Sequence, residues 1–589
     1  MYDLLIKGGT IIDGTQSPRF VGDLAIKDGI VERIDGNIRS DRAKRVIDAT
    51  GKIVAPGVID SHTHYDAQMF WDPYASNTGW HGGTTVAIGN CGFGFAPCER
   101  DPAKQARVMK LMEHTEQIAA DAMRAGLDWD WDDLPSWINR LRRVNKGVNV
   151  AVHMPLNILM AYVMGMDEAK TRAPTREEMG RMKILLNEGM EAGAIGFAFT
   201  FQGFLANHVD FDGSFMPTDC MQPEVAYELA EVLRDRGHGV IQVNCDKVGG
   251  TDNKYIAKEL AKVSGQRVLF NLLSVFEGSD GAHVSRLEWL DEVEKEGLNI
   301  YSQGHQFRPW VEFTVNDTNM WDPVPFLRQF CVADKAEKLR MAADSTFRAE
   351  LKRDYDPKMM VTCGGGLGTY MLINDNGSGR FAKYKGETLA TIVEREQSNI
   401  VDVFLDLVLE SEGAADFRTT KMLVDDVDIV GPIMEHKRVV AGTSDGGAHN
   451  KFWAGGYYPT DIIKFFSRET NKFDLELLHA KFSLLPARAL GLHKRGALIE
   501  GWAADAYIYD YDKIDHPPVF EKKYDLPGGE WRVDLPSIGI DWTIVNGEPT
   551  LKGMEPTGAY PGRIVGSAGA EMDERLNLPV EARVLEAAE

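Results

Sequence analysis

Features that mark secreted and membrane proteins are scarce or missing in this sequence. Its 589 residues include only 6 cysteines, none of them in a Cys-x-x-Cys pair, which argues against a disulfide framework and a zinc ribbon. No long uncharged apolar run occurs, and the chain opens as a strand (Tyr2 to Ile6) rather than as a basic-then-apolar leader. We therefore expect a cytoplasmic protein without a membrane partner.

Positive charge is also in short supply. Lys and Arg number 65 against 88 Asp and Glu, which gives a net charge of -23 at pH 7. This balance argues against nucleic acid and anionic membrane as partners and suits a small-molecule substrate. The composition is otherwise that of an ordinary globular protein, and the length predicts one large domain with additions or two to three domains.

An apolar run that ends in two histidines, residues 57–64, is the strongest local signal. Residues two apart on a strand point the same way, so His62 and His64 can present both imidazoles to one ion. Two surface histidines would look the same in isolation. The apolar residues before them suit a strand buried on both faces, which places the pair at the C-terminal end of a parallel strand.

Both ends of the chain consist of short strands separated by turn pairs. Residues 1–55 carry Asp-Gly and Gly-Gly turns between alternating apolar residues, and residues 490–562 show the same chemistry around an Asn-Gly turn. Neither end has enough strands for a stable sheet of its own. We therefore expect the two ends to join into one small β-sandwich.

Between these ends, strand-like runs alternate with amphipathic helical runs. The strand-like runs comprise the one before His62 and then Thr84–Gly89, Val148–Val152, Ala194–Ala198, Gly239–Val243, Val268–Leu272, Leu298–Tyr301 and Arg438–Thr443. The helical runs are Pro102–Arg124, Arg176–Ala192, Pro223–Arg236, Asn253–Val263, Ser285–Glu296 and Leu389–Glu412. Eight such strands predict an α/β fold, a (β/α)8 TIM barrel over residues 56–489 that is inserted in the sandwich.

Two segments do not fit the alternation. Residues 305–388 are far longer than a usual crossover, which predicts a lid-like insertion whose aromatic residues wall a pocket or form their own small core. Residues 563–589 are expected to be a C-terminal tail or an arm in a homo-oligomer.

Two further polar residues follow predicted strands and therefore face the mouth of the barrel. Cys91 lies in a glycine-rich turn after the second strand, where it is either a metal ligand or a buried small hydrophobic residue. Asp445 follows the eighth strand between small residues, which favours a ligand or a general base over a turn-forming aspartate.

Three motifs together resemble the amidohydrolase superfamily, in its D-aminoacylase (N-acyl-D-amino-acid deacylase) branch. They are Gly-Val-Ile-Asp-Ser-His-Thr-His-Tyr-Asp (57–66), Gly-Asn-Cys-Gly-Phe-Gly (89–94) and Gly-Thr-Ser-Asp-Gly (442–446), and further likeness lies at 193–197 and 479–506. The resemblance implies zinc-dependent hydrolysis of N-acyl-D-amino acids. It also implies that His62, His64 and Asp445 form one metal position and that Cys91 is the thiolate ligand of the neighbouring zinc.

The sequence departs from this family at the ligands after strands five and six. Where the family has histidines, this chain has Asn244 and then Asn271 or Leu272. Because an amide oxygen is a poor zinc ligand, we expect one tightly bound ion, zinc or another divalent metal, instead of two. His305 after strand seven and His153 after strand three are candidate replacements.

The prediction from the sequence is thus a metal-dependent hydrolase of amide bonds other than peptide bonds. Asp445 serves as the proton shuttle, Lys451 as the clamp for a substrate carboxylate, and His449 as a hydrogen-bond donor, with His305 and Asn244 also on the substrate side. Two alternatives stay open. One is a hydrolase of cyclic or neutral amides, and the other is a catalytically silent binding protein with a degraded metal site.

Overall fold

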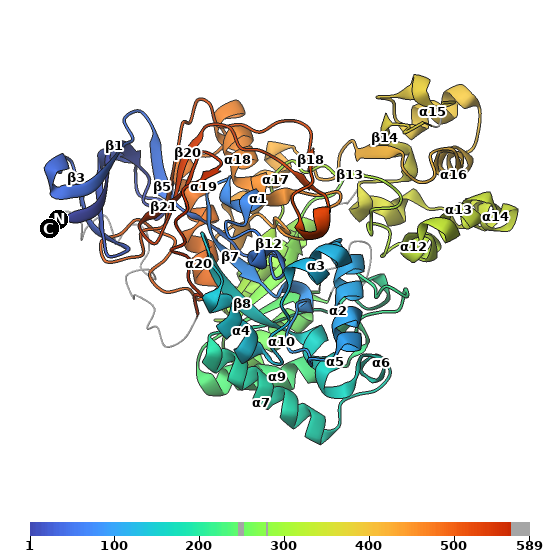
Figure 1. Cartoon of the computed structure of the whole chain (residues 1–589), viewed down its shortest axis with the longest axis horizontal. Coiled ribbons are helices and arrows are strands. Elements are labelled where there is room, and N and C mark those ends of the chain that lie inside the picture. The colour runs from blue at the N-terminus through green and yellow to red at the C-terminus, as the bar shows by residue number, and fades with distance from the viewer. Residues whose placement is uncertain (246–252, 278–280, 378, 567–589) are drawn as a thin grey trace.

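The computed structural model describes residues 1–245, 253–277, 281–377 and 379–566. The predicted C-terminal tail therefore lies almost entirely outside the described residues. Three parts are visible along the chain in Figure 1: a sheet built from both ends, a helix-covered barrel, and a projecting yellow insertion. None of the helices in the described part of the chain has the length and apolar character that a membrane crossing needs.

The centre of the molecule is an eight-stranded parallel sheet, which confirms the predicted barrel. Its order is β16-β12-β11-β10-β9-β8-β7-β6. A parallel bridge between Thr63 and Gly446 joins the segments that follow the two edge strands. The strands are β6 (Val58–Asp60), β7 (Gly83–Ile88), β8 (Asn149–Pro155), β9 (Gly196–Thr200), β10 (Val240–Asn244), β11 (Arg267–Leu273), β12 (Ile300–Gly304) and β16 (Val439–Ala441). Every predicted strand is present.

Helices cover the outside of this sheet. They include α4 (Leu134–Arg143), α5 (Leu156–Met164), α7 (Arg176–Ala192), α9 (Pro223–Arg236), α10 (Lys254–Ser264) and α11 (Ala282–Lys295). Helix α7 starts with a capping box in which the Thr175 hydroxyl accepts from the Glu178 N–H and the Glu178 side chain returns to the cap. Its bounds are those predicted from the sequence.

The prediction of one continuous helix over Pro102–Arg124 is wrong in one respect. This segment forms α2 (Pro102–Thr115) and α3 (Ala120–Gly126), with Glu116 as the residue that ends α2. Gln117 follows with φ of 53°, a left-handed conformation that no right-handed helix can continue. The break turns the chain at Glu116 instead of carrying it further along the barrel wall.

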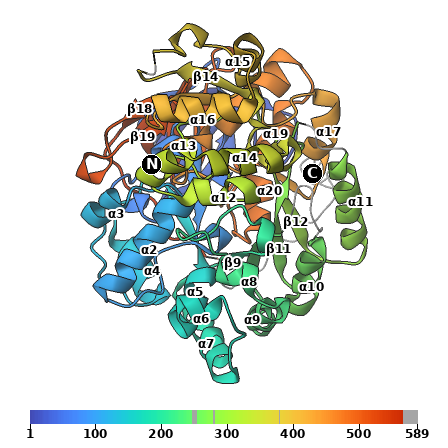
Figure 2. The same cartoon turned by 90° about the vertical axis from the view of Figure 1, so that its right-hand side faces the viewer.

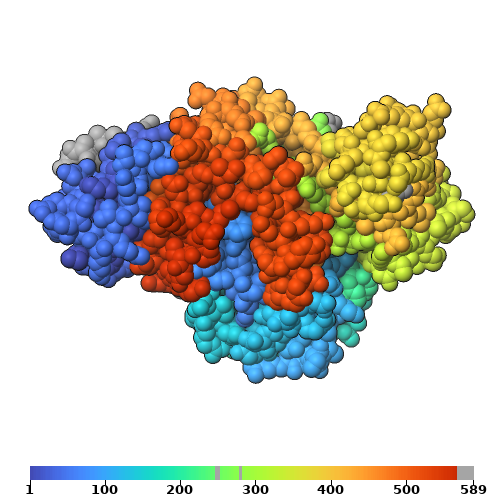
Figure 3. Space-filling model, turned by 45° about the horizontal axis from the view of Figure 1, so that its top comes forward, coloured from blue at the N-terminus to red at the C-terminus, as the bar shows by residue number. Residues whose placement is uncertain are grey.

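Both chain ends join, as predicted, but they contribute to one mixed sheet of nine strands where a β-sandwich was expected. Strand β5 pairs in parallel with β1 from the first end and antiparallel with β17 from the second, so a single mixed sheet spans both. Figure 1 shows the blue N-terminal strands against the red C-terminal ones, and in Figure 3 the blue and red segments adjoin on the surface. The strands are β1 (Tyr2–Ile11), β2 (Phe20–Lys27), β3 (Ile30–Asp35), β4 (Ala43–Asp48), β5 (Ile53–Pro56), β17 (Ala506–Tyr509), β20 (Ile540–Val545), β21 (Glu548–Lys552) and β22 (Glu555–Pro556).

The insertion extends beyond the predicted range of 305–388. Strand β15 (Asp416–Thr419) pairs with both β13 (Glu312–Phe313) and β14 (Tyr370–Asn374), so the chain cannot rejoin the barrel before residue 419. The prediction of a barrel helix over Leu389–Glu412 is therefore wrong. This segment forms two helices of the insertion, α15 (Leu389–Glu396) and α16 (Ile400–Glu410). The insertion also contains α12 (Pro325–Val332), α13 (Lys335–Ala343) and α14 (Ser345–Asp354).

Aromatic residues form the insertion's own core, which was one of the two expected uses. The rings of Phe313, Trp321, Tyr370, Phe404 and Phe417 pack on one another and are fully buried or nearly so. In Figure 2 the insertion helices face the viewer, over the barrel.

A buried ion pair holds the start of the insertion to the barrel side. The backbone N–H of Arg308 donates to Asp461 Oδ2 (2.8 Å), and its Nη2 lies 2.6 Å from Asp461 Oδ1. Asp461, in α18 (Tyr458–Ile462), is 1% exposed. Removing one partner of a buried pair leaves the other charge without compensation.

We expect Asp461→Ala to lower the free energy of unfolding by about 3 kcal/mol, because the Arg308 guanidinium loses its buried carboxylate and keeps only the exposed Glu469, 3.4 Å away. The measurement is the midpoint of urea unfolding. Asp35→Ala, which breaks the exposed pair with Arg33, is the matched control and should leave the midpoint unchanged. An equal midpoint for Asp461→Ala and wild type would show that the pair does not anchor the insertion.

Candidate metal and active site

A cavity of about 440 Å³ lies at the C-terminal ends of the barrel strands. Residues after the strands line one side, and residues of the insertion line the other. The barrel side includes His62, His64, Cys91, Asn244, Asn271, His305, Asp445 and His449, and the insertion side includes Asn319, Met320, Lys358, Met359 and Thr362. The predicted polar side chains are thus brought to one cavity, with Lys451 and His153 as the exceptions.

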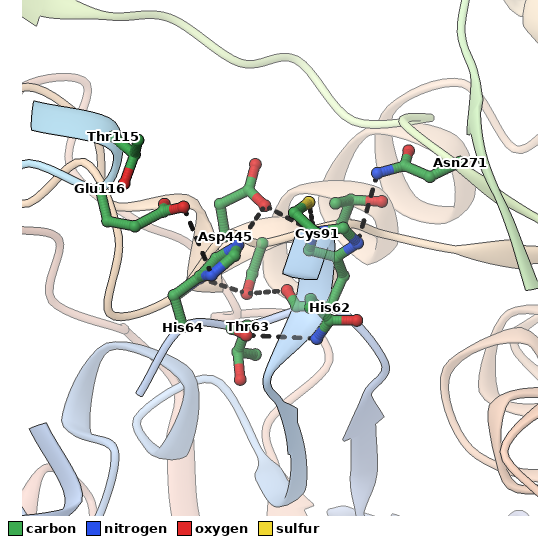
Figure 4. Close-up of polar contacts among 12 residues, drawn as sticks. His62, Thr63, His64, Cys91, Thr115, Glu116, Asn271 and Asp445 are labelled. Carbon is green, nitrogen blue, oxygen red and sulfur yellow. Dashed lines mark hydrogen bonds and ion pairs between the residues drawn. The ribbon is translucent and has the colours of Figure 1, made fainter. Parts of the chain in front are cut away.

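Four of these side chains converge within ligand distance of one another (Figure 4). Cys91 Sγ lies 3.3 Å from His62 Nε2, and Asp445 Oδ1 lies 3.4 Å from His62 Nε2 and 3.8 Å from His64 Nε2. A tetrahedral ion with arms of about 2.1 Å needs ligand atoms roughly 3.4 Å apart. The spacing therefore fits one divalent ion, and His62, His64 and Cys91 also form a compact donor group by themselves.

Backbone conformation distinguishes two of the four residues. Cys91 and Asp445 adopt left-handed φ values of 56° and 49°. Residues other than glycine rarely occupy this region, and such strain concentrates at functional sites. The glycines that flank both residues supply the sharp turns in which these conformations occur.

Amide side chains behind the ligands orient them. Gln303 Nε2 donates to the Ser61 carbonyl (3.1 Å), which directs Gln303 Oε1 to His62 Nδ1 at 2.9 Å. His62 therefore donates from Nδ1 and keeps the lone pair of Nε2 for the ion, the usual arrangement of a histidine ligand. Gln242 Oε1 accepts the Cys91 backbone N–H (2.9 Å) and holds that turn.

Burial shifts the protonation of the site. It lowers the pKa of His62 to about 4, so the imidazole is neutral, as a ligand must be. It raises the pKa of Asp445 to about 7 and that of Cys91 well above its ordinary value, where Glu116 and Asp445 add to the effect. A bound cation would lower the pKa values of Asp445 and Cys91 again, because it stabilises the carboxylate and the thiolate. The donor set therefore suits a metal ion.

Asn244, and Asn271 or Leu272, stand where the family resemblance implied histidines. Asn244 Oδ1 accepts from Gln202 Nε2 (3.2 Å), and Asn271 Nδ2 lies 3.3 Å from His62 Nδ1. Asn271 and Leu272 both line the cavity, and Figure 4 shows the Asn271 amide directed at His62. The sulfur of Cys91 thus has neutral amides on the side where imidazoles were expected.

Some of the other predicted residues line the cavity and others lie away from it. His305 donates from Nε2 to the Thr443 carbonyl (2.9 Å) and lines the cavity together with His449. His153 is buried and does not line the cavity.

Lys451 is not at the cavity, which corrects the prediction that it clamps a substrate carboxylate. Its Nζ lies 3.0 Å from Glu530 Oε2 and 4.3 Å from the centre of the Trp531 ring, so an ion pair and a cation–π contact hold it elsewhere. Among the described residues that line the cavity, Lys358 is the only lysine or arginine. The sequence carried no sign of this, because Lys358 lies within the insertion, far along the chain from the barrel motifs.

Two further polar residues at the site were missed. Glu116 Oε1 lies 3.7 Å from His64 Nδ1, and Glu116 forms a group with His208 and His449 in which the ligand atoms are within 4.8 Å of one another. No pattern marked either residue, since Glu116 lies in a run predicted as helix and His208 in a loop.

Comparison with known proteins agrees with this geometry. Residues 45–226 match the amidohydrolase family. D-aminoacylase of Alcaligenes xylosoxydans xylosoxydans is 24% identical over 572 residues, which cover 97% of this chain and 98% of that protein. N-acyl-D-glutamate deacylase of the same organism is 25% identical over 574 residues, 96% of each protein.

A solved structure shows the same fold. The N-acyl-D-glutamate deacylase of Bordetella bronchiseptica, complexed with zinc and a phosphonate inhibitor, is similar with a TM-score of 0.63 at 22% identity, over 96% of this chain and 99% of that chain. The family match spans the strands that carry His62, His64 and Cys91. The chain is thus similar to the amidohydrolase family over residues 45–226 and to the two deacylases over nearly its whole length, which supports a hydrolase of carbon–nitrogen bonds other than peptide bonds.

Proposed function

We propose that this protein hydrolyses the amide bond of N-acyl amino acids, with D configuration at the α-carbon, and that the reaction depends on a metal ion. The observation that carries the proposal is the convergence of Cys91, His62 and Asp445, with ligand atoms 3.3 to 3.4 Å apart at the end of the barrel. The names of the relatives, D-aminoacylase and N-acyl-D-glutamate deacylase, support the substrate class and its configuration.

His62, His64, Cys91 and Asp445 are the residues that would hold the ion. When bound, it supplies Lewis acidity that activates water and polarises the amide carbonyl. Asp445, whose carboxylate opens to the cavity, takes the proton of the attacking water and returns it to the leaving nitrogen. Gln303 keeps the His62 imidazole in the required tautomer throughout.

The insertion contributes to this function by covering the cavity. Met320, Met359 and Thr362 line it together with the candidate ligands, so a substrate in the cavity would contact both the barrel and the insertion. We propose that this cover excludes bulk water from the reacting amide and selects the acyl portion.

A second candidate is a hydrolase of cyclic or neutral amides. The cavity lining favours it in one respect, because amide side chains such as Gln202, Asn244 and Asn271 outnumber cationic ones there. The amide side chains of the cavity can donate and accept hydrogen bonds, so they can bind a neutral amide group of a substrate as well as a carboxylate.

A panel of substrates separates these two functions. We expect turnover of N-acyl-D-amino acids, slower turnover of the L enantiomers, and loss of both after removal of the metal by a chelator. Equal turnover of carboxyl-free amides would support the second candidate. Undiminished activity of protein shown by elemental analysis to be metal-free would exclude the metal-dependent reaction altogether.

Lys358 is the residue that we propose to bind the substrate carboxylate. Its side chain is exposed and has no ion-pair partner within the described part of the chain, and it lines the same cavity as Asp445 and His449. We expect Lys358→Ala to raise KM for N-acyl amino acids about tenfold without lowering kcat, because it removes a binding contact worth roughly 1.4 kcal/mol in both ground and transition states.

Steady-state kinetics on matched substrates measure this effect. KM for a carboxyl-free amide should not change in Lys358→Ala, and Lys451→Ala, which removes a lysine held by Glu530, should change neither constant. A tenfold rise in KM for both kinds of substrate would show that Lys358 shapes the insertion instead of binding a carboxylate.

A further inference from the structure

A second group of metal-binding side chains lies beside the His62–His64–Cys91 group. We propose that Glu116, His208 and His449 form a separate site for a divalent metal ion. The inference goes beyond the proposed function, because it concerns residues that neither the barrel motifs nor the missing histidines of strands five and six include. It also replaces the expectation of a single ion per chain, which considered only those motifs.

Three segments that are distant in sequence bring these side chains together. Glu116 ends helix α2, His208 follows β9 beyond a short turn (Gly203–Leu205), and His449 follows β16 with a left-handed φ of 53°. One ligand atom of each residue lies within 4.8 Å of the others. The backbone N–H of His449 donates to the Glu116 carbonyl, which ties the loop to the end of the helix.

Unpaired polar atoms in this cluster indicate a site that can bind a cation. Glu116 is 0% exposed, yet neither of its carboxylate oxygens has a hydrogen-bond partner, and Nδ1 of His208 and Nδ1 of His449 have none either. Among the described residues, the ion-pair partner of Glu116 is His64, at 3.7 Å, which is too long for a hydrogen bond. A buried carboxylate left this way costs several kcal/mol, which a cation bound among the three residues would offset.

The chemistry of the three donors suits such an ion. Two imidazoles and one carboxylate form the ligand set of many catalytic zinc sites and of some Fe(II) sites, and three ligands leave a position open. The imidazole rings of His208 and His449 lie parallel, with an interplanar angle of 7° and centres 5.8 Å apart. Both histidines line the cavity, so the open position is accessible to small molecules.

The imidazole ring of His64 lies between the two groups of candidate ligands. His64 presents Nε2 to Asp445 at 3.8 Å and Nδ1 to Glu116 at 3.7 Å, as the dashed lines of Figure 4 show. Each group nevertheless has its own donors, and only the first contains a thiol. This difference allows the two sites to be told apart by spectroscopy.

The test is a titration of chelator-stripped, full-length protein with Zn²⁺, with the bound metal counted by elemental analysis after desalting. Wild type should bind two ions per chain, and Glu116→Gln and His208→Asn should each bind one. A parallel titration with Co²⁺ should give near-ultraviolet thiolate-to-cobalt absorption from the Cys91 site in all three proteins. The visible d–d absorption should be reduced in both variants.

Glu113→Gln is the matched control, because Glu113 lies three residues earlier on the same helix, is exposed, and accepts the Ala120 N–H. It should bind two ions. Metal-free Glu116→Gln should melt at or above the temperature of metal-free wild type, because the substitution removes a buried carboxylate, so its lost ion is not a consequence of unfolding. Saturation of wild type at one ion, or two ions in Glu116→Gln, would overturn the proposal.

Discussion

Replacement of Asp445 by Asn is expected to lower kcat by about 10³-fold, since general acid–base catalysis by one positioned group contributes roughly 10²- to 10⁴-fold. The amide keeps the size of the side chain and an oxygen for the ion, but it cannot accept the proton of the attacking water. Asp445 is the only carboxylate that lines the described cavity, so no neighbour replaces it there. The measurement is single-turnover kinetics on an N-acyl-D-amino acid.

Metal analysis of the same variant separates the two roles of Asp445. We expect Asp445→Asn to retain the ion, because His62, His64 and Cys91 form a donor group without it. Loss of the ion together with activity would make Asp445 chiefly a ligand. Activity within about tenfold of wild type would assign proton transfer to a different residue.

The double substitution of His62 and His64 by Asn is expected to abolish tight metal binding at the Cys91 site. Substitution of residues that only orient a ligand already lowers metal affinity by about 10- to 100-fold, so removal of two ligands should lower it by more than about 100-fold. Activity should fall with it, to the rate of the metal-free protein. Elemental analysis and Co²⁺ absorption in the near-ultraviolet measure the loss.

His479→Asn is the control for the general effect of removing a buried imidazole. His479 is fully buried outside the cavity, with Nε2 2.9 Å from the Tyr509 hydroxyl, so its variant should keep the metal. Unchanged near-ultraviolet absorption in the folded His62→Asn/His64→Asn protein would show that other residues hold the ion beside Cys91.

Much of the fold could be read from the sequence, because the signals are local. A strand buried on both faces has a continuous apolar run, and a crossover helix has a periodic one, whatever their partners are. The eight strands and the exact bounds of α7 and α9 followed from these patterns. The placement of His62, His64, Cys91 and Asp445 at one cavity followed as well, since parallel strands end at a common edge.

The errors arose where long-range packing determines the local structure. Leu389–Glu412 has the pattern of a barrel helix, but the pairing of β15 with β13 and β14 assigns it to the insertion. The end of α2 at Glu116 depends on the left-handed turn at Gln117, which no helix propensity marks. Lys451 had the right position in the loop for a clamp, but a distant glutamate, Glu530, pairs with it.

The sequence by itself therefore determined the barrel, the joining of both chain ends and the first group of candidate ligands, because each follows from local signals: apolar runs, turn pairs and polar residues directly after a strand. Only the tertiary structure decided the group of Glu116, His208 and His449 and the position of Lys358 at the cavity. These side chains come from a helix end, two loops and an inserted subdomain. Their proximity results from the packing of segments up to hundreds of residues apart, for which a single sequence carries no local pattern.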